Sequence, residues 1–199
     1  MTGLVLVRHL QTDMAGRFCG HSDPELNELG RGRLPSLLTA LSNYAIDRVY
    51  ASNLRRAQQT AKAIAGHFNA EVHLRPGLRE IYFGLWEGLS WRDIETRDPI
   101  EAKVWTDTYP NATAPGGEPI EQFQSRVREE IAFLAEQSAN SVSAVVTHAG
   151  FMRVALTICG APEQAAWEQT GEYGSIIALD SSRIDRFEIP EHSRQNSIK

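Results

Sequence analysis

The feature that most constrains this chain is an apolar run near its N-terminus that stops abruptly at two basic residues. Residues 4–7 read Leu-Val-Leu-Val, and Arg8 and His9 follow directly. A short apolar run of this kind is typical of a strand that is buried on both faces. In open α/β sheets, ligands bind at the carboxyl ends of the strands. We therefore expect Arg8 and His9 to lie at a ligand site for which the rest of the chain supplies partners.

The composition narrows the class of protein and its partners. The chain has 199 residues and a net charge of -5, which argues against a nucleic-acid or anionic-membrane surface. No apolar run approaches the roughly 20 residues that span a bilayer. Residues 1–3 lead straight into the first strand, without the basic region and apolar core of a secretory signal. We expect a cytoplasmic protein without nucleic-acid or membrane partners, and the sequence leaves a homodimer open.

Strands and helices alternate in the pattern of the first 75 residues. A strand is predicted at 47–51, a helix at 54–68 with Ser52-Asn53 as its N-cap, and a third strand at 71–74. Residues 25–43 carry leucines at nearly helical spacing, but Pro35 either marks the start of that helix or kinks it. This alternation is typical of a doubly wound α/β sheet.

The pattern changes between residues 75 and 119, where three of the four tryptophans lie among Gly, Pro, Asp and Thr. Only short helices are predicted there, at 90–96 and 100–106, and we interpret the segment as an excursion over the sheet. The elements predicted after it are a helix at 121–138, a strand at 143–147, a helix at 150–160 and a strand at 173–179. The pattern thus predicts a single domain over residues 1–190, followed by a mobile tail at 191–199.

Four cationic or cation-capable side chains follow predicted strands: Arg8, His9, Arg56 and His148. Because the carboxyl ends of neighbouring parallel strands converge, we expect these side chains to share one pocket. Arginine binds phosphoryl oxygens as a bidentate fork, and histidine serves as a nucleophile on phosphorus or as an acid and base. A metal site is the rival interpretation, but an arginine beside a ligand repels a dication, and no HxH or HExxH spacing occurs. The pattern favours a phosphoryl pocket.

Phosphoryl transfer through a histidine also needs a proton donor for the leaving alkoxide, commonly a carboxyl group. Of the 25 acidic residues, Glu80 is the best candidate by context. It lies in the segment LREIYFGLWEG, whose aromatic and aliphatic side chains could partly desolvate it. An ordinary solvated glutamate in a loop is the alternative that the residues alone leave open.

Four segments resemble the signature segments of the histidine phosphatase superfamily, in the same order. They are LVRHLQT, YASNLRRAQQTA, LREIYFGLWEG and VVTHAG, and the resemblance covers about residues 4–180. It implies the phosphoglycerate mutase-like fold, an α/β three-layer α/β/α sandwich on a mostly parallel sheet, with residues 75–119 capping the site. No metal and no cofactor are implied.

The same resemblance implies a role for each candidate residue. His9 would be the catalytic nucleophile that becomes phosphohistidine, and Glu80 the catalytic acid that then activates water. Phosphate would be bound by Arg8, Arg56 and His148, with His148 also part of the catalytic group. The implied activity is that of a phosphomonoesterase with a small-molecule phosphomonoester as its partner.

The chain departs from the family pattern in the loop after His9. The pattern RHGET has Gly and Glu where this chain has Leu10 and Gln11, and many members carry a phosphate-binding Asn where this chain has Ala15. A glycine allows close approach or unusual dihedrals, so Leu10 is expected to reshape the loop or to restrict the pocket. These departures motivate one alternative, a phosphate-ligand binding protein with reduced turnover. Phosphoglycerate mutase-type transfer is the other.

Within the superfamily, GRFCGHSDPEL and YFGLWEG most resemble the segments of the α-ribazole phosphatase type. This likeness implies a nucleotide-like substrate such as α-ribazole 5'-phosphate and a place in cobalamin biosynthesis. Trp86, Trp91 or Trp105 could stack on the aromatic base of such a substrate. Packing of the excursion itself is the alternative explanation for these tryptophans, and the sequence favours it.

Overall fold

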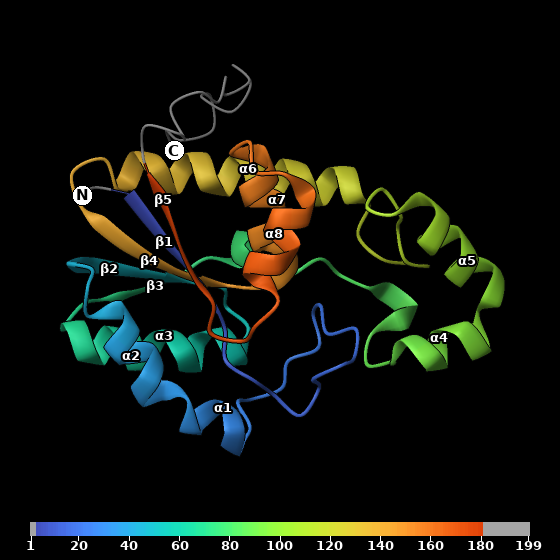
Figure 1. Ribbon diagram of the computed structural model, residues 1–199, viewed down its shortest axis with the longest axis horizontal. Helices are drawn as coiled ribbons and strands as arrows, with labels where there is room; N and C mark the ends of the chain where they lie inside the picture. The colour runs from blue at the N-terminus through green and yellow to red at the C-terminus, as the bar shows by residue number, and fades with distance from the viewer. Residues whose placement is uncertain (1–2, 181–199) are drawn as a thin grey trace, which may run out of the picture.

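The computed structural model describes residues 3–180, which form one five-stranded sheet with helices on both sides (Figure 1). The strand order is β3-β2-β4-β1-β5. The strands are β1 at Gly3–Arg8, β2 at Ile46–Ala51, β3 at Val72–Leu74, β4 at Val142–Thr147 and β5 at Ile176–Asp180. All neighbours pair in parallel except β1 and β5, which are antiparallel. The predicted mostly parallel sheet is confirmed.

Two helical layers cover the sheet, one on each face (Figure 1). The helices of one layer are α2 at Leu34–Leu41 and α3 at Arg55–Phe68, and those of the other are α6 at Ile120–Gln137 and α7 at Ala149–Ile158. Strand β1 serves both layers because successive side chains point to opposite faces. Val5 and Val7 pack with the α2 and α3 core, whereas Leu4 and Leu6 pack with the α6 and α7 core. The predicted three-layer α/β/α sandwich is confirmed.

The helix predicted at 25–43 is two helices, α1 at Glu28–Gly32 and α2, which join at Arg33. Pro35 lies in the first turn of α2. A proline is tolerated there because its missing N–H would have no partner within the helix. Of the two expectations for Pro35, a helix start near this residue is therefore the correct one.

The predicted N-cap of α3 is wrong, because the capping residue is Leu54 and its side chain makes no cap hydrogen bond. Ser52 instead accepts a hydrogen bond from the Leu54 N–H at 3.3 Å. The N–H of Arg55 donates to a carboxylate oxygen of Asp23 at 2.5 Å. The Asp23 side chain, distant in sequence, thus accepts from an N–H in the first turn of α3 that has no partner within the helix. This hydrogen bond ties the loop after β1 to α3.

The excursion contains the two short helices that were predicted, α4 at Trp91–Arg97 and α5 at Pro99–Thr108. Two 3-10 turns precede them, η1 at Pro76–Leu78 and η2 at Gly84–Trp86. In Figure 1, α4 and α5 lie beside the sheet and not over its face, so that part of the expectation is corrected. Their core is a separate apolar cluster around the fully buried Trp86.

The chain after α7 differs from the prediction in one element. Helix α8, Glu163–Thr170, was not predicted, and β5 begins three residues later than expected. The predicted domain limit at residue 190 and the tail at 191–199 lie outside the described residues and stay predictions.

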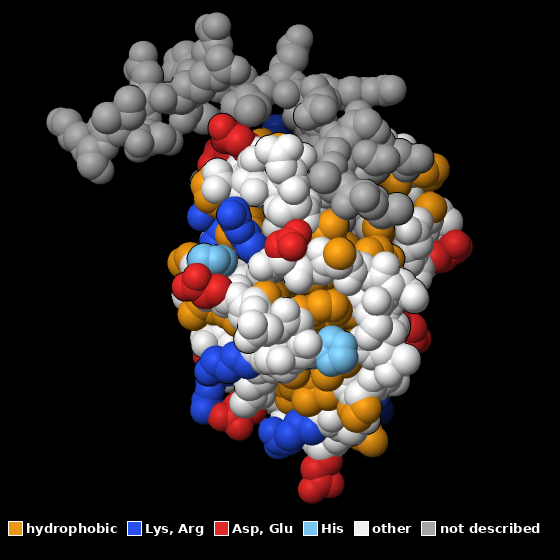
Figure 2. Space-filling view, turned by 90° about the vertical axis from the view of Figure 1, so that its left-hand side faces the viewer, with side chains coloured by type: hydrophobic (Ala, Val, Ile, Leu, Met, Phe, Trp, Pro, Cys, Tyr) orange, Lys and Arg blue, Asp and Glu red, His pale blue; other side chains and the backbone are white. Residues whose placement is uncertain are grey.

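None of the described helices is long and apolar enough to cross a membrane. On the face drawn in Figure 2, basic side chains are interspersed with acidic and apolar ones.

Candidate active site

His9 follows β1 directly and is 7% exposed. Its Nδ1 lies 2.7 Å from the carbonyl oxygen of Leu10. A carbonyl only accepts, so Nδ1 carries the proton and the lone pair lies on Nε2. Burial, and then the positive charge of Arg56, lower the pKa of His9 well below its ordinary value. At neutral pH the imidazole is therefore neutral, and Nε2 carries the lone pair that a nucleophile or a base needs.

Arg56, in the first turn of α3, is fully buried beside this imidazole. Its Nε donates to Nε2 of His9 at 3.3 Å. The other guanidinium nitrogens donate to main-chain carbonyls of Cys19, Gly20 and Ser22 at 2.6 to 3.1 Å. A buried cation is costly unless its donors are satisfied. The loop before α1 meets this need and holds Arg56 against His9.

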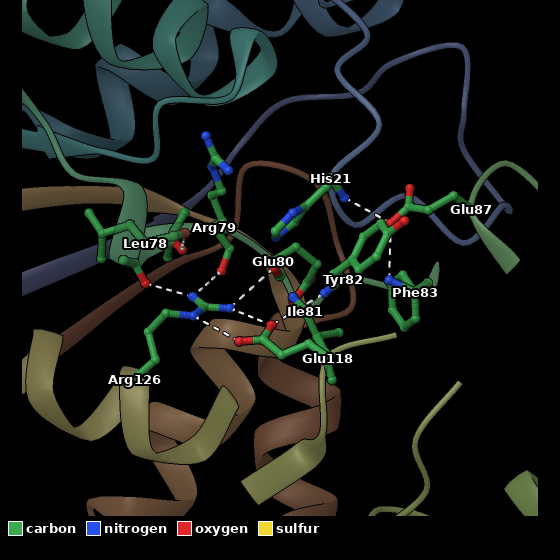
Figure 3. A network of polar contacts seen from close by, with 12 residues as sticks. His21, Leu78, Arg79, Glu80, Ile81, Tyr82, Phe83, Glu87, Glu118 and Arg126 are labelled. Carbon is green, nitrogen blue, oxygen red and sulfur yellow. Dashed lines mark hydrogen bonds and ion pairs between the residues drawn. The ribbon is translucent and has the colours of Figure 1, made fainter. Parts of the chain in front are cut away.

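Glu87 in turn holds this loop. Its carboxylate accepts hydrogen bonds from the N–H groups of Gly20, His21, Ser22 and Phe83 and from the Ser22 hydroxyl, at 2.6 to 3.2 Å. Figure 3 shows part of this contact set. Burial acts to raise the pKa of Glu87, but the hydrogen bonds from these donors outweigh it and lower the pKa. Sequence reasoning missed Glu87, although it lies in the aromatic and glycine-rich segment that also carries Glu80.

His148 lies beside His9 because of the strand register. Arg8 of β1 pairs with Thr147 of β4, so the next residue of each strand is a histidine, and the two ring centroids are 5.0 Å apart. His148 is almost fully buried, and neither ring nitrogen has a hydrogen-bond partner among the described residues. Burial, and then Arg56 and His9, lower its pKa well below the ordinary value. The His148 ring thus lies beside His9 with the hydrogen-bonding capacity of its nitrogens unused among the described residues.

Arg8 is anchored by the link between α8 and β5. Its guanidinium donates to the carbonyl oxygens of Thr170 at 2.9 Å and Gly171 at 2.6 Å. It also lies over the ring of Tyr173, 4.1 Å from the centroid, and that ring is 5.6 Å from His9. Tyr173 was predicted only as a strand residue. Its place under Arg8 depends on the unpredicted helix α8.

Glu80 lies in the irregular segment between η1 and η2 and is 8% exposed. One carboxyl oxygen accepts from the Gly150 N–H at 2.8 Å and the other from the Ile81 N–H at 3.0 Å. A Cβ at position 150 would lie 2.3 Å from Oε1 of Glu80, so any larger residue there would displace the carboxyl group. Glu80 lines the same cavity as Arg8 and His9. The structure therefore brings the five predicted site residues together: Arg8, His9 and Glu80 line the cavity, while Arg56 and His148 contact His9.

The departure at Leu10 does not restrict this cavity. Leu10 is buried in the core with α2 and α3, and its N–H donates to the hydroxyl of Thr60 at 3.2 Å. Its side chain packs against Gly174, where a Cβ would lie 2.9 Å from it. Gly174 has φ +77°, a conformation that favours glycine. The larger residue after His9 is accommodated inside the core, away from the site.

The cavity in front of His9 has a volume of about 860 Å³ and extends from the sheet to the excursion. Aromatic side chains form its outer wall: Trp91, Trp105, Tyr109 and Trp167. Trp86 is fully buried and donates from its indole N–H to Asp98 at 2.8 Å, so a stacking role for it is wrong. Among residues 3–180, no three His, Cys, Asp or Glu side chains group as a metal site requires.

Two arginines and two histidines at the carboxyl end of a mostly parallel sheet, with a carboxyl group facing them, define a class of protein that binds and transfers phosphoryl groups. The model of the histidine phosphatase superfamily (branch 1) matches residues 4–189, and the chain belongs to this superfamily.

Characterised relatives agree with this assignment. The adenosylcobalamin/alpha-ribazole phosphatase of Salmonella typhimurium is 32% identical over 180 residues, which are 89% of each chain. Phosphoserine phosphatase 1 of Hydrogenobacter thermophilus is 30% identical over 155 residues, 77% of this chain and 74% of that one. The crystal structure of the alpha-ribazole phosphatase from Shigella flexneri superposes with a TM-score of 0.73 at 28% identity, covering 89% of this chain and 85% of that chain. The protein is a phosphoric monoester hydrolase that acts on a small phosphorylated metabolite.

Proposed function

We propose that this phosphatase works through a phosphohistidine on His9 and that its substrate is a small nucleotide-like phosphomonoester such as α-ribazole 5'-phosphate. One observation carries the mechanism: a neutral His9 whose Nε2 faces Arg56, with its Nδ1 proton held by a carbonyl. This arrangement presents a lone pair to phosphorus beside a fixed positive charge.

In the first step, Nε2 of His9 attacks phosphorus in line with the leaving oxygen. Arg8, Arg56 and His148 bind the phosphoryl oxygens, and their donors stabilise the charge of the transition state. As the bond to the leaving oxygen breaks, Glu80 in its acid form gives that oxygen a proton. The products are an alcohol, a phosphohistidine and a Glu80 carboxylate.

In the second step, the Glu80 carboxylate takes a proton from water while the water oxygen attacks phosphorus. The bond between phosphorus and Nε2 breaks, which restores neutral His9 and releases phosphate. Glu80 ends in its acid form, ready for the next cycle. Glu80 thus acts as the acid of the first step and as the base of the second.

The cavity supports the substrate class. Its volume of about 860 Å³ far exceeds the space that a phosphoryl group needs, and Trp91 and Trp105 offer faces for an aromatic base. The names of the relatives from Salmonella and Shigella point to the same class. The relative from Hydrogenobacter is named for phosphoserine, so a substrate test must include small amino-acid and sugar phosphates.

The test is phosphate release from a panel of α-ribazole 5'-phosphate, phosphoserine, 3-phosphoglycerate and ribose 5-phosphate, by the natural protein and by His9→Ala. We expect the highest kcat/KM for α-ribazole 5'-phosphate and loss of turnover in the variant. Equal turnover by both proteins would refute His9 as the nucleophile. Transfer between positions of phosphoglycerate that outpaces phosphate release would favour the mutase.

A cytoplasmic location and a homodimer remain predictions of the sequence. Cell fractionation tests the first, and sedimentation of the purified protein at several concentrations tests the second. A sedimentation coefficient that stays at the value of one 22.1 kDa chain would exclude the dimer.

A further inference from the structure

Glu80 needs support from outside its own segment. Residues 79–83 belong to no helix or strand, so their main-chain groups lack the regular hydrogen bonds that hold a side chain in place. Proton transfer, however, depends on the position of the donor to within a fraction of an ångström. A segment of irregular backbone that carries such a donor requires contacts that fix it.

Arg126 of α6 provides these contacts. Its NH1 donates to the carbonyl oxygens of Gly77 at 2.7 Å and Arg79 at 2.9 Å, and its NH2 to that of Glu80 at 3.4 Å. Nε and NH2 also donate to the two carboxylate oxygens of Glu118, at 3.0 and 2.7 Å. A guanidinium has five N–H donors, and here they meet five acceptors. Figure 3 shows the guanidinium directed at this segment.

Glu118 extends the same clamp beyond Glu80. Its own N–H donates to the Tyr82 carbonyl at 2.9 Å, and its carboxylate accepts from the Tyr82 N–H at 3.3 Å. The Arg126 and Glu118 side chains are 23% and 17% exposed, so their fork is shielded from most of the solvent. Together they hold the main chain on both sides of Glu80.

We propose that Arg126 is the positioning residue for Glu80 in proton transfer. By fixing the carbonyls of residues 77, 79 and 80, it keeps the Glu80 carboxyl group against the Gly150 N–H at the cavity wall. All the described hydrogen bonds of the Arg126 side chain go to Glu118 and to the segment that carries Glu80, so it acts on the reaction through that segment. This inference rests on the proposed function, which gives Glu80 the proton.

The chain offers a matched control whose acidic partner lies on the same helix. Arg75 forms a fork with Glu130 of α6, at 2.6 and 3.0 Å, and its guanidinium lies over the ring of Phe133. These side chains are about as shielded as the Arg126 fork, at 29% and 13% exposure. The Arg75 side chain contacts none of the carbonyls at residues 77–80 in the described hydrogen bonds. Arg75→Met therefore removes a similar ion pair and leaves the clamp intact.

The experiment compares kcat/KM for two substrates that differ in their need for a proton, because kcat/KM reports only the steps up to release of the alcohol and leaves out hydrolysis of the phosphohistidine. Nitrophenolate leaves from p-nitrophenyl phosphate without one, whereas the alkoxide of ribose 5-phosphate requires one. For Arg126→Met we expect kcat/KM to fall about 10²-fold on ribose 5-phosphate and less than about threefold on the nitrophenyl ester. Arg75→Met is expected to change both by less than about twofold. If Arg126→Met does not fold, Arg126→Lys takes its place, with the same selectivity and a smaller loss.

Glu80→Gln separates failure of this inference from failure of the proposed function. It must itself lower kcat/KM selectively on ribose 5-phosphate, and the double variant with Arg126→Met must have a kcat/KM no lower than that of Glu80→Gln alone. If Glu80→Gln lowers kcat/KM equally on both substrates, the proton donor is misassigned and the inference falls with it. If Glu80→Gln is selective but Arg126→Met slows both substrates equally, or neither, only the positioning role is wrong.

Discussion

Replacing Glu87 by glutamine tests how Arg56, which we propose binds phosphate, is held. The carboxylate accepts five hydrogen bonds, three on one oxygen and two on the other. An amide retains one acceptor oxygen, so the better orientation keeps three bonds and turns an NH2 group toward the N–H donors of His21 and Phe83. Two bonds to a charged acceptor are lost, and we expect unfolding free energy to fall by about 3 kcal/mol. The loop that carries the carbonyl partners of Arg56 then loosens.

The consequence for the site is measurable apart from stability. A displacement of Arg56 by about 1 Å is expected to lower kcat/KM by on the order of 10²-fold. Loss of one charge-assisted hydrogen bond from Arg56 to the bound anion is expected to weaken orthovanadate inhibition by about tenfold. Asp47→Asn is the control, because the Asp47 carboxylate accepts from the Val142 N–H at the amino end of β4, and none of its described hydrogen bonds goes to the loop. A Glu87→Gln protein that unfolds more easily but keeps its kcat/KM and vanadate affinity would refute the reasoning.

Two further predictions follow from the burial of the site. Because the pKa values of His9 and His148 are lowered in the folded protein, the unfolded chain takes up protons below its ordinary pKa of about 6.5 and the folded one does not. The contribution of these two histidines to the free energy of unfolding is therefore fully present above that pH. It falls as pH decreases, by up to about 1.4 kcal/mol per pH unit for each histidine. Urea unfolding between pH 7.5 and 5 measures this decrease, and a flat profile contradicts it. Gly150→Ala would push its Cβ into Glu80 and is expected to lower kcat on ribose 5-phosphate at least tenfold. Gly66→Ala in α3, where the new Cβ meets nothing within 4 Å, should leave kcat unchanged and serves as the control.

The fold was predictable because its strands are short apolar runs and its helices carry apolar residues at helical spacing. Each run ends at a polar residue, and parallel pairing then brings the ends together, which is why Arg8, His9 and His148 were found from the sequence. Glu80 was harder, since it lies in a segment without periodicity. It was chosen by its neighbours and by resemblance.

The missed features depend on contacts between distant parts of the chain. Helix α8 reads EQAAWEQT, which is short and mostly polar and gives little helical signal. Glu87 and Arg126 each form hydrogen bonds with main-chain groups that lie more than 45 residues away in the sequence. No local sequence pattern encodes such contacts. Trp86 was predicted together with Trp91 and Trp105 as a candidate for stacking on a substrate. Its full burial inside the excursion distinguishes it from the other two.

The central claim is that His9 carries the phosphoryl group during turnover. The most direct measurement is rapid quenching of the reaction with labelled p-nitrophenyl phosphate under alkaline conditions, followed by mass spectrometry of the peptide that contains His9. We predict a burst of about one phosphoryl group per chain on His9, labile to acid, stable to base and absent from His9→Ala. Steady turnover of the natural protein with no phosphohistidine at any quench time, or label on another residue, would contradict the mechanism.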